Sequence, residues 1–157
     1  MISTSINYPS NLPYPARDGY SAQYVSPLMR TKTISGRAIQ RRQFTTVPAM
    51  YNVSWIFTTS GDAAAFEAWF RDVVKDGAEW FNCPMRTPIG TGQYVCRFTD
   101  IYEGPNPYGV CGWTVRAELE MFERPLMPEG WGILPDYIAM ADIFDVAMND
   151  RWPKANQ

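Results

Sequence analysis

The sequence predicts a β-rich α+β protein: a small β-sandwich or barrel with one helix packed on its sheet. Three features lead to this prediction. Apolar and polar residues alternate over 51–58, as in a strand with one buried face, and a helical pattern over 61–76 follows directly. Two more alternating segments, 94–99 and 111–121, come after the helix. Residues 103–109 separate them and are dense in turn formers, which predicts a long hairpin.

The helix predicted over 61–76 has one aromatic face. Its large apolar side chains recur at positions i, i+3, i+4 and i+7: Phe66, Trp69, Phe70 and Val73. Ser60 or Asp62 can accept hydrogen bonds from the first free backbone N–H groups of this helix. Gly77 suits the left-handed residue at which a helix ends.

A short strand is expected directly after this helix. It covers residues 78–82 and should end at Cys83 and Pro84, since proline cannot donate to the hydrogen-bond ladder. Residues 84–91 then form a loop, in which Gly90 is a hairpin feature rather than part of a phosphate cradle, because no helix follows it.

The predicted hairpin fixes an expected register. If the turn at 103–109 is symmetric, Phe98 lies opposite Trp113, and Tyr94 lies opposite Ala117. Both apolar sets then share one face, on which the helix can lie. We therefore expect four aromatic side chains to be buried together: Trp55, Phe66, Phe70 and Trp113.

The chain of 157 residues is long enough for one domain with additional arms. We expect an extended arm rich in tyrosine and proline over 1–27 and a β-sandwich core domain over 28–125. A C-terminal extension follows over 126–157. It contains a weak amphipathic helix over 134–152, with Asp136 near its start.

Prolines in the N-terminal arm exclude both a helix and a central strand there. Its tyrosines are regularly spaced along an extended chain: Tyr8, Tyr14, Tyr20 and Tyr24. Either the arm wraps its own domain, or these tyrosines dock on a neighbouring subunit, since tyrosine offers a large contact area at low entropic cost.

A second hairpin is predicted from residues 27–34 and 37–44, with a tight turn at Ser35 and Gly36. It carries the main basic concentration of the chain: Arg37, Arg41 and Arg42, with Arg30 and Lys32. These side chains either form a solvated strand face, or contact an acidic partner surface or passing DNA. We single out Arg37, Arg41 and Arg42 as candidate subunit contacts.

The composition limits the classes of function. The chain is 46% hydrophobic and 15% aromatic but only 19% charged, which points to much buried or partner-covered surface. Its net charge of −2 gives no global electrostatic case for binding nucleic acid or acidic membranes. It contains no histidine, so the commonest general base and metal ligand is missing.

No catalytic, cofactor-binding or metal-binding residues are expected, and we do not predict an enzyme. Glu118 and Glu120 share the outward face of a strand with Arg116, which indicates a surface charge ladder. We expect the acidic residues near the C-terminus to cap and solubilise the helix there rather than to bind a metal ion: Asp136, Asp142, Asp145 and Asp150.

The cysteines and the distribution of apolar residues indicate where the protein is made. Cys83, Cys96 and Cys111 are odd in number and widely spaced, so buried free thiols are expected. Neither a signal peptide nor an apolar run of membrane-spanning length is evident. We expect synthesis in the cytoplasm and no membrane partner.

Several segments resemble those of tailed-phage structural proteins. Residues 66–71, the Gly-Ala-Glu-Trp-Phe stretch at 77–81 and the end of the long hairpin at 118–125 are similar to minor tail proteins of the lambda M type. They also resemble the N-terminal domain of distal tail proteins, and the similarity of pattern covers 35–125. Two stretches near the C-terminus resemble segments of other phage structural proteins: 128–132 and 142–149.

The resemblance implies a virion structural protein that forms an oligomeric ring in a phage tail, usually with six-fold symmetry. Its partners would be further copies of itself and neighbouring tail or neck proteins, with DNA only as passing cargo in the channel. The two terminal arms would suit a head–tail connector or tail-terminator protein equally well. A small cytoplasmic nucleic-acid-binding β domain is the alternative from another class. It would need exposed aromatics interleaved with basic residues, whereas here the aromatics fall on apolar strand faces.

Overall fold

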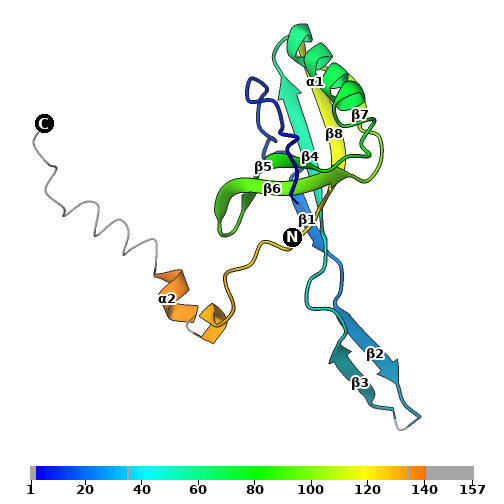
Figure 1. Cartoon of the computed structure of the whole chain (residues 1–157), viewed down its shortest axis with the longest axis vertical. Coiled ribbons are helices and arrows are strands. Elements are labelled where there is room, and N and C mark those ends of the chain that lie inside the picture. The colour runs from blue at the N-terminus through cyan, green and yellow to red at the C-terminus, as the bar shows by residue number, and fades with distance from the viewer. Residues whose placement is uncertain (1–2, 35, 134, 141–157) are drawn as a thin grey trace, which may run out of the picture. The chain divides into compact units, whose positions relative to one another are not determined.

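The computed structural model describes residues 3–34, 36–133 and 135–140. It divides the chain into two compact units, Met1–Pro125 and Leu126–Gln157. The described residues of the first unit form one α-helix, α1 (Ser60–Asp72), and eight strands: β1 (Ser21–Tyr24), β2 (Leu28–Lys32), β3 (Ala38–Arg42), β4 (Ala49–Phe57), β5 (Phe81–Thr87), β6 (Gly90–Phe98), β7 (Glu103–Tyr108) and β8 (Gly112–Met121). Figure 1 shows these elements.

Six of the strands form one antiparallel sheet, in the order β1-β4-β8-β6-β5, with β7 also paired to β8. Strands β2 and β3 form a separate two-stranded sheet. This arrangement confirms a β-rich α+β fold with a helix against the sheet. The six-stranded sheet is mostly open, so the finer expectation of a sandwich or barrel stays a prediction.

Helix α1 lies alongside β4 and β8 (Figure 1). It begins one residue earlier than expected, because Thr59 is the N-cap and its Oγ1 accepts a hydrogen bond from the N–H of Asp62 at 3.2 Å. It ends at Asp72 rather than at residue 76. Lys75, Asp76 and Gly77 all have positive φ, which takes the chain out of the helix.

Aromatic rings fill the space between α1 and the sheet. The ring of Phe66 lies 5.2 Å from that of Trp55, and the ring of Phe70 lies 4.9 Å from that of Phe98. These four side chains are buried, which confirms the expected burial of Trp55, Phe66 and Phe70. Trp113, which we expected to join them, is only half-buried, and its Nε1 donates a hydrogen bond to Ser60 Oγ at 3.0 Å.

The predicted register of the long hairpin is wrong. Phe98 lies opposite Leu119, and Trp113 pairs with Phe57 on one side and Pro107 on the other. The reason is that residues 103–108 form strand β7 rather than a turn. β7 pairs with the first half of β8, so β6 pairs only with the last three residues of β8.

The strand after the helix also differs from the prediction. β5 runs from Phe81 to Thr87 and continues through Pro84, which was expected to end it. Proline is tolerated there because β5 lies at the edge of the sheet. Residues 84–87, which were expected to belong to a loop, instead pair with β6. Gly90, with φ of 121°, opens β6 as the hairpin feature expected from the sequence.

The N-terminal arm is part of the fold of its own chain. The backbone N–H of Tyr8 donates to the carbonyl of Asn82 on β5 at 2.9 Å, and the N–H of Ala16 donates to the carbonyl of Ser54 on β4 at 2.7 Å. Strand β1 then pairs with β4. Between these anchors, Tyr8 and Leu12 are buried in the core. The arm therefore spans two strands of the sheet, β5 and β4.

The second unit contains a 3-10 helix, Trp131–Ile133, and α2, Pro135–Ala139. Helix α2 lies within the helix expected over 134–152, and the N–H of Met140 donates to the carbonyl of Asp136 at 3.0 Å. The remainder of that expected helix, with Asp142, Asp145 and Asp150, lies outside the described residues.

The aromatic packing predicts the effect of shortening one side chain of the helix. Phe70→Ala should lower the free energy of unfolding by about 3–5 kcal/mol, because it removes a buried ring and leaves a cavity. Val73→Ala, at a position that is 42% exposed at the end of the same helix, should cost less than about 1 kcal/mol. Urea unfolding of both variants measures the difference, and equal midpoints would contradict this packing.

The arm provides a second comparison. Tyr8 and Tyr14 both precede a proline, yet Tyr8 is 6% exposed and Tyr14 is 61% exposed. Tyr8→Ala should therefore destabilise the chain by about 3 kcal/mol or more, as the loss of a core aromatic does. Tyr14→Ala should change stability by less than about 0.5 kcal/mol. Thermal unfolding followed by circular dichroism tests this. An unchanged melting temperature for Tyr8→Ala would contradict the burial of the arm in the core.

Candidate functional site

The hairpin of β2 and β3 is an exposed element of the first unit. The two strands confirm the hairpin that the sequence predicted. Its register runs from Leu28 opposite Arg42 to Lys32 opposite Ala38, and Gly36 in its turn has φ of 80°. Every strand residue is exposed except the half-buried Ala38. Both faces of the hairpin are therefore open to a partner. A partner would also stabilise it, because an isolated two-stranded hairpin is only marginally stable in water.

The two faces of this hairpin differ in chemistry. Successive side chains of a strand point to opposite faces, and directly paired residues share one face. Arg30, Lys32 and Arg42 therefore lie together on one side, which we call the basic face. The opposite side, the apolar face, presents Met29 and Ile39.

The three arginines singled out from the sequence are not brought together. Arg42 belongs to the basic face, where its Nε donates to the carbonyl of Phe44 at 2.9 Å and its Nη2 to that of Thr45 at 2.6 Å. Arg41 lies on the apolar face, with its Nη2 3.5 Å from the sulfur of Met29. Arg37 lies in the turn, where its carbonyl accepts a hydrogen bond from the hydroxyl of Thr33. Alternation along β3 separates Arg41 from Arg42.

Charge is strongly segregated along the chain. No acidic residue occurs between Asp18 and Asp62, whereas the hairpin region contains five basic residues. The chain as a whole has a net charge of −2, so a hairpin of +5 leaves the remainder at −7. In the part of the chain that the structure describes, none of these five basic side chains forms an ion pair. This run without acids is the sequence signal that identifies the hairpin as a separate charged element.

The four tyrosines proposed as subunit contacts have different environments. Tyr8 is buried in its own core, where its hydroxyl donates to the carbonyl of Pro13 at 2.7 Å, so it cannot offer a surface to a neighbour. Tyr20 is half-buried, and its hydroxyl donates to the carbonyl of Arg86 at 2.6 Å. Burial raises the pKa of Tyr20 to about 12. Tyr14 is largely exposed, and Tyr24 is partly covered by the guanidinium group of Arg124, 4.3 Å from its ring centre.

A hollow acidic surface surrounds the connection between β6 and β7. Two adjoining cavities of about 490 and 630 Å³ share Thr99, Asp100 and Ile101 in their walls. We call them together the acidic groove, since five carboxylates and two guanidinium groups line them: Asp76, Asp100, Glu103, Glu118, Glu120, Arg97 and Arg116. The charge ladder expected at Glu118 and Glu120 is part of this groove.

Some of the charges in the groove are already engaged. Nη2 of Arg97 lies 2.6 Å from Oε2 of Glu120, and the guanidinium group of Arg97 also covers the ring of Trp80 at 4.6 Å. Glu118 accepts a hydrogen bond from Thr99 Oγ1 at 2.9 Å. Among the described residues, Glu120 is the one carboxylate of the groove with a cationic partner. The groove therefore keeps a net negative charge.

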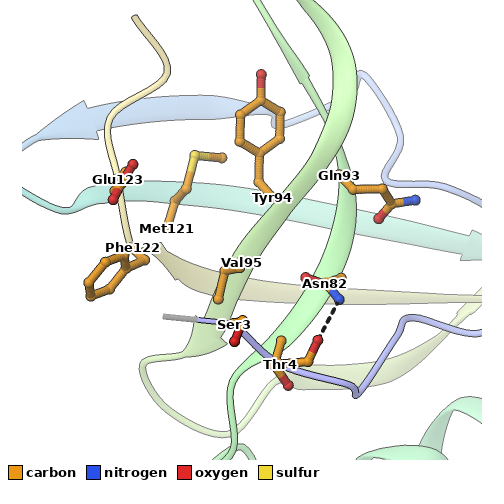
Figure 2. Close-up of a pocket in the computed structure, with 9 residues that line it drawn as sticks. All are labelled: Ser3, Thr4, Asn82, Gln93, Tyr94, Val95, Met121, Phe122 and Glu123. Carbon is orange, nitrogen blue, oxygen red and sulfur yellow. Dashed lines mark hydrogen bonds between the residues drawn. The ribbon is translucent and has the colours of Figure 1, made fainter. Parts of the chain in front are cut away.

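A third cavity, of about 410 Å³, lies between the start of the arm, β5, β6 and the end of β8 (Figure 2). One wall is held by Asn82, whose Nδ2 donates to the carbonyl of Thr4 at 3.1 Å. The hydroxyl of Tyr94, on another wall, lies 2.9 Å from that of Thr87. Glu123 supplies the remaining titratable side chain. This lining contains no paired acid and base of the kind that general catalysis requires.

The three thiols are free but not equivalent. Cys83 and Cys96 are buried, as expected, and burial raises the pKa of both, that of Cys96 to about 12. Such thiols stay protonated and unreactive at neutral pH. Cys111, which we expected to be buried, is exposed, because it lies in the turn just before β8 and outside the alternation of that strand.

The described residues also bear on metal binding and on membrane insertion. No group of three or more cysteine, aspartate or glutamate side chains there could hold a metal ion. No helix among them is long and apolar enough to cross a membrane.

Comparisons with known proteins give no relationship. No protein-family model matches the chain, and neither the curated proteins nor the solved structures contain a significant match.

The buried thiols and tyrosines predict a loss of stability at alkaline pH. In the unfolded chain the thiols ionise near their ordinary pKa of 9.0, whereas in the folded chain Cys96 stays protonated up to about pH 12. Their stabilising contribution is complete below pH 9 and falls as the pH rises toward the folded pKa. Each such group should remove at most about 1.4 kcal/mol per pH unit.

Urea unfolding between pH 7 and pH 11 measures this effect. Above pH 10 the buried tyrosines, whose pKa values are also raised by burial, should steepen the decline. Cys96→Ala should give a shallower slope between pH 9 and pH 10 than the unmodified chain. A free energy of unfolding that stays constant across this range would contradict the burial of these groups.

Proposed function

We propose that this protein is a virion structural component that assembles into an oligomeric ring in a phage tail, as a hub, distal tail or minor tail protein. The observation that carries the proposal is the uncovered hairpin of β2 and β3. Its apolar face exposes Ile39 to 65%, and its other face is basic. Covering both faces with another protein would remove apolar surface from water and satisfy the unpaired charges.

The resemblance of residues 35–125 to tail proteins supports the same proposal, because it covers strand β3 of the hairpin and every strand of the six-stranded sheet except β1. In this proposal the sheet, bridged by the N-terminal arm, is the small β-sandwich or barrel of the subunit. The ring would enclose the DNA channel and contact tail tube and baseplate proteins. DNA would pass through as cargo rather than be read.

Assembly accounts for these features better than catalysis does. The chain has no histidine, and two of its three thiols are buried with raised pKa values. The exposed chemistry is concentrated instead in one hairpin and one groove, which are features of recognition. We therefore propose a structural role without a cofactor.

The apolar face provides the test. Met29→Thr combined with Ile39→Thr keeps good strand propensity while removing apolar surface, so the chain should fold normally but lose self-association. Ile89→Thr combined with Val110→Thr is the matched control, since both residues are exposed but lie in other turns. Sedimentation velocity over a range of concentrations, followed by electron microscopy, measures the oligomers.

We expect rings from the unmodified chain and from the control variant, and monomers from the hairpin variant. Equal assembly by the hairpin variant would remove the hairpin from the proposal. A chain that stays monomeric at all concentrations, alone and with tail tube protein, would contradict the function itself.

A further inference from the structure

We propose that the basic face of the hairpin docks in the acidic groove of a second copy of this chain. The inference rests on the proposed function, because it names the two surfaces through which copies would join. Both surfaces belong to the first unit, and no hairpin residue lines the groove of its own chain. The contact is thus directed from one copy to the next.

The charges of the two surfaces are complementary. The basic face brings Arg30, Lys32 and Arg42 together without an acidic residue on either strand. The acidic groove of one copy has five carboxylates and two guanidinium groups. One of these guanidinium groups, that of Arg97, is already paired with Glu120. Opposite potentials of this kind steer two surfaces together and fix their register.

The two surfaces also match in their apolar parts. Leu28 shares the basic face and lies at its base, half exposed. Ile101 lies where the two cavities of the groove meet and is 69% exposed. A contact that pairs the charges can therefore bury these two side chains at the same time, which adds affinity beyond that of exposed ion pairs.

The two surfaces are different, so the contact is heterologous. Each copy presents its hairpin to one neighbour and its groove to the other, and such contacts generate a ring when the rotation closes. This geometry leaves the apolar face of the hairpin free for a second contact. Self-association then uses both faces of the hairpin: the basic face in the groove of the next copy, and the apolar face in a further contact between copies.

DNA is the competing occupant of the basic face, since it would satisfy the same three cations. The acidic groove favours a second copy over DNA, because negatively charged DNA cannot bind to a surface rich in carboxylates. A second copy of the chain accounts for both surfaces with one contact.

Zero-length cross-linking tests the docking directly. Carbodiimide joins a lysine amine to a carboxylate only when the two are in contact, and Lys32 is the one lysine of the hairpin. Equal amounts of ordinary and ¹⁵N-labelled full-length chain are assembled, cross-linked and analysed by mass spectrometry. Linked peptides of mixed label come from two different copies. We expect mixed-label links from Lys32 to Asp100, Glu103 or Glu118.

Charge reversal provides an independent test with a rescue. Arg30→Glu with Arg42→Glu, or Asp100→Lys with Glu103→Lys, should each weaken self-association at least about tenfold. Combining all four substitutions in one chain should restore it, since the complementarity is then inverted. Arg71→Glu with Arg86→Glu, outside both surfaces, should have no effect. All variants should melt within a few degrees of the unmodified chain, because exposed charges contribute little to stability.

The outcomes separate this inference from the proposed function. If the chain assembles but Lys32 links to carboxylates outside the groove, or the combined variant is not rescued, the docking is overturned and the ring remains. If reversal at Arg30 and Arg42 abolishes binding to a labelled duplex but leaves self-association intact, the basic face serves DNA, and the docking is again overturned. A chain that never associates contradicts both.

Discussion

The structure depends on how β8 shares its hydrogen bonds. One edge of this strand pairs with β4 along nine residues, while the other edge is divided between β7 and β6. The chain must leave β8 at Phe98 and return to it at Glu103, and the connection between these points forms the wall shared by the two cavities of the acidic groove. The aromatic rings under α1 then fix β4 and β6 relative to the helix. The groove is therefore a consequence of strand pairing.

The sequence could predict elements but not their pairing. Alternation with period two located β4 and β8, and the tight turn at Gly36 was sufficient for the β2–β3 hairpin. The same alternation does not show which strand pairs with which. The prolines in residues 103–108 indicated a turn, although these residues form an edge strand. The basic residues of the site could be found, but their division into two faces required the register. The groove joins residues from 19 to 120 and has no local pattern.

Tyr8 and Tyr14 show why local reasoning fails for the arm. Each is followed by proline in an extended segment, so their immediate sequences predict the same environment. The difference comes from Asn82, whose backbone bonds to Ile6 and Tyr8 direct the first tyrosine inward, where its ring lies 5.5 Å from that of Trp69. An arm without regular secondary structure thus becomes part of the core through a few backbone hydrogen bonds to an edge strand.

The unequal exposure of the three thiols has a practical meaning. Cys83 and Cys96 are sealed in the core and protonated, whereas Cys111 stands in the turn between β7 and β8. A maleimide added at neutral pH would therefore modify a single sulfur of the folded chain. The native sequence supplies its own attachment point for a fluorophore or a heavy atom, at a position distant in sequence from the hairpin.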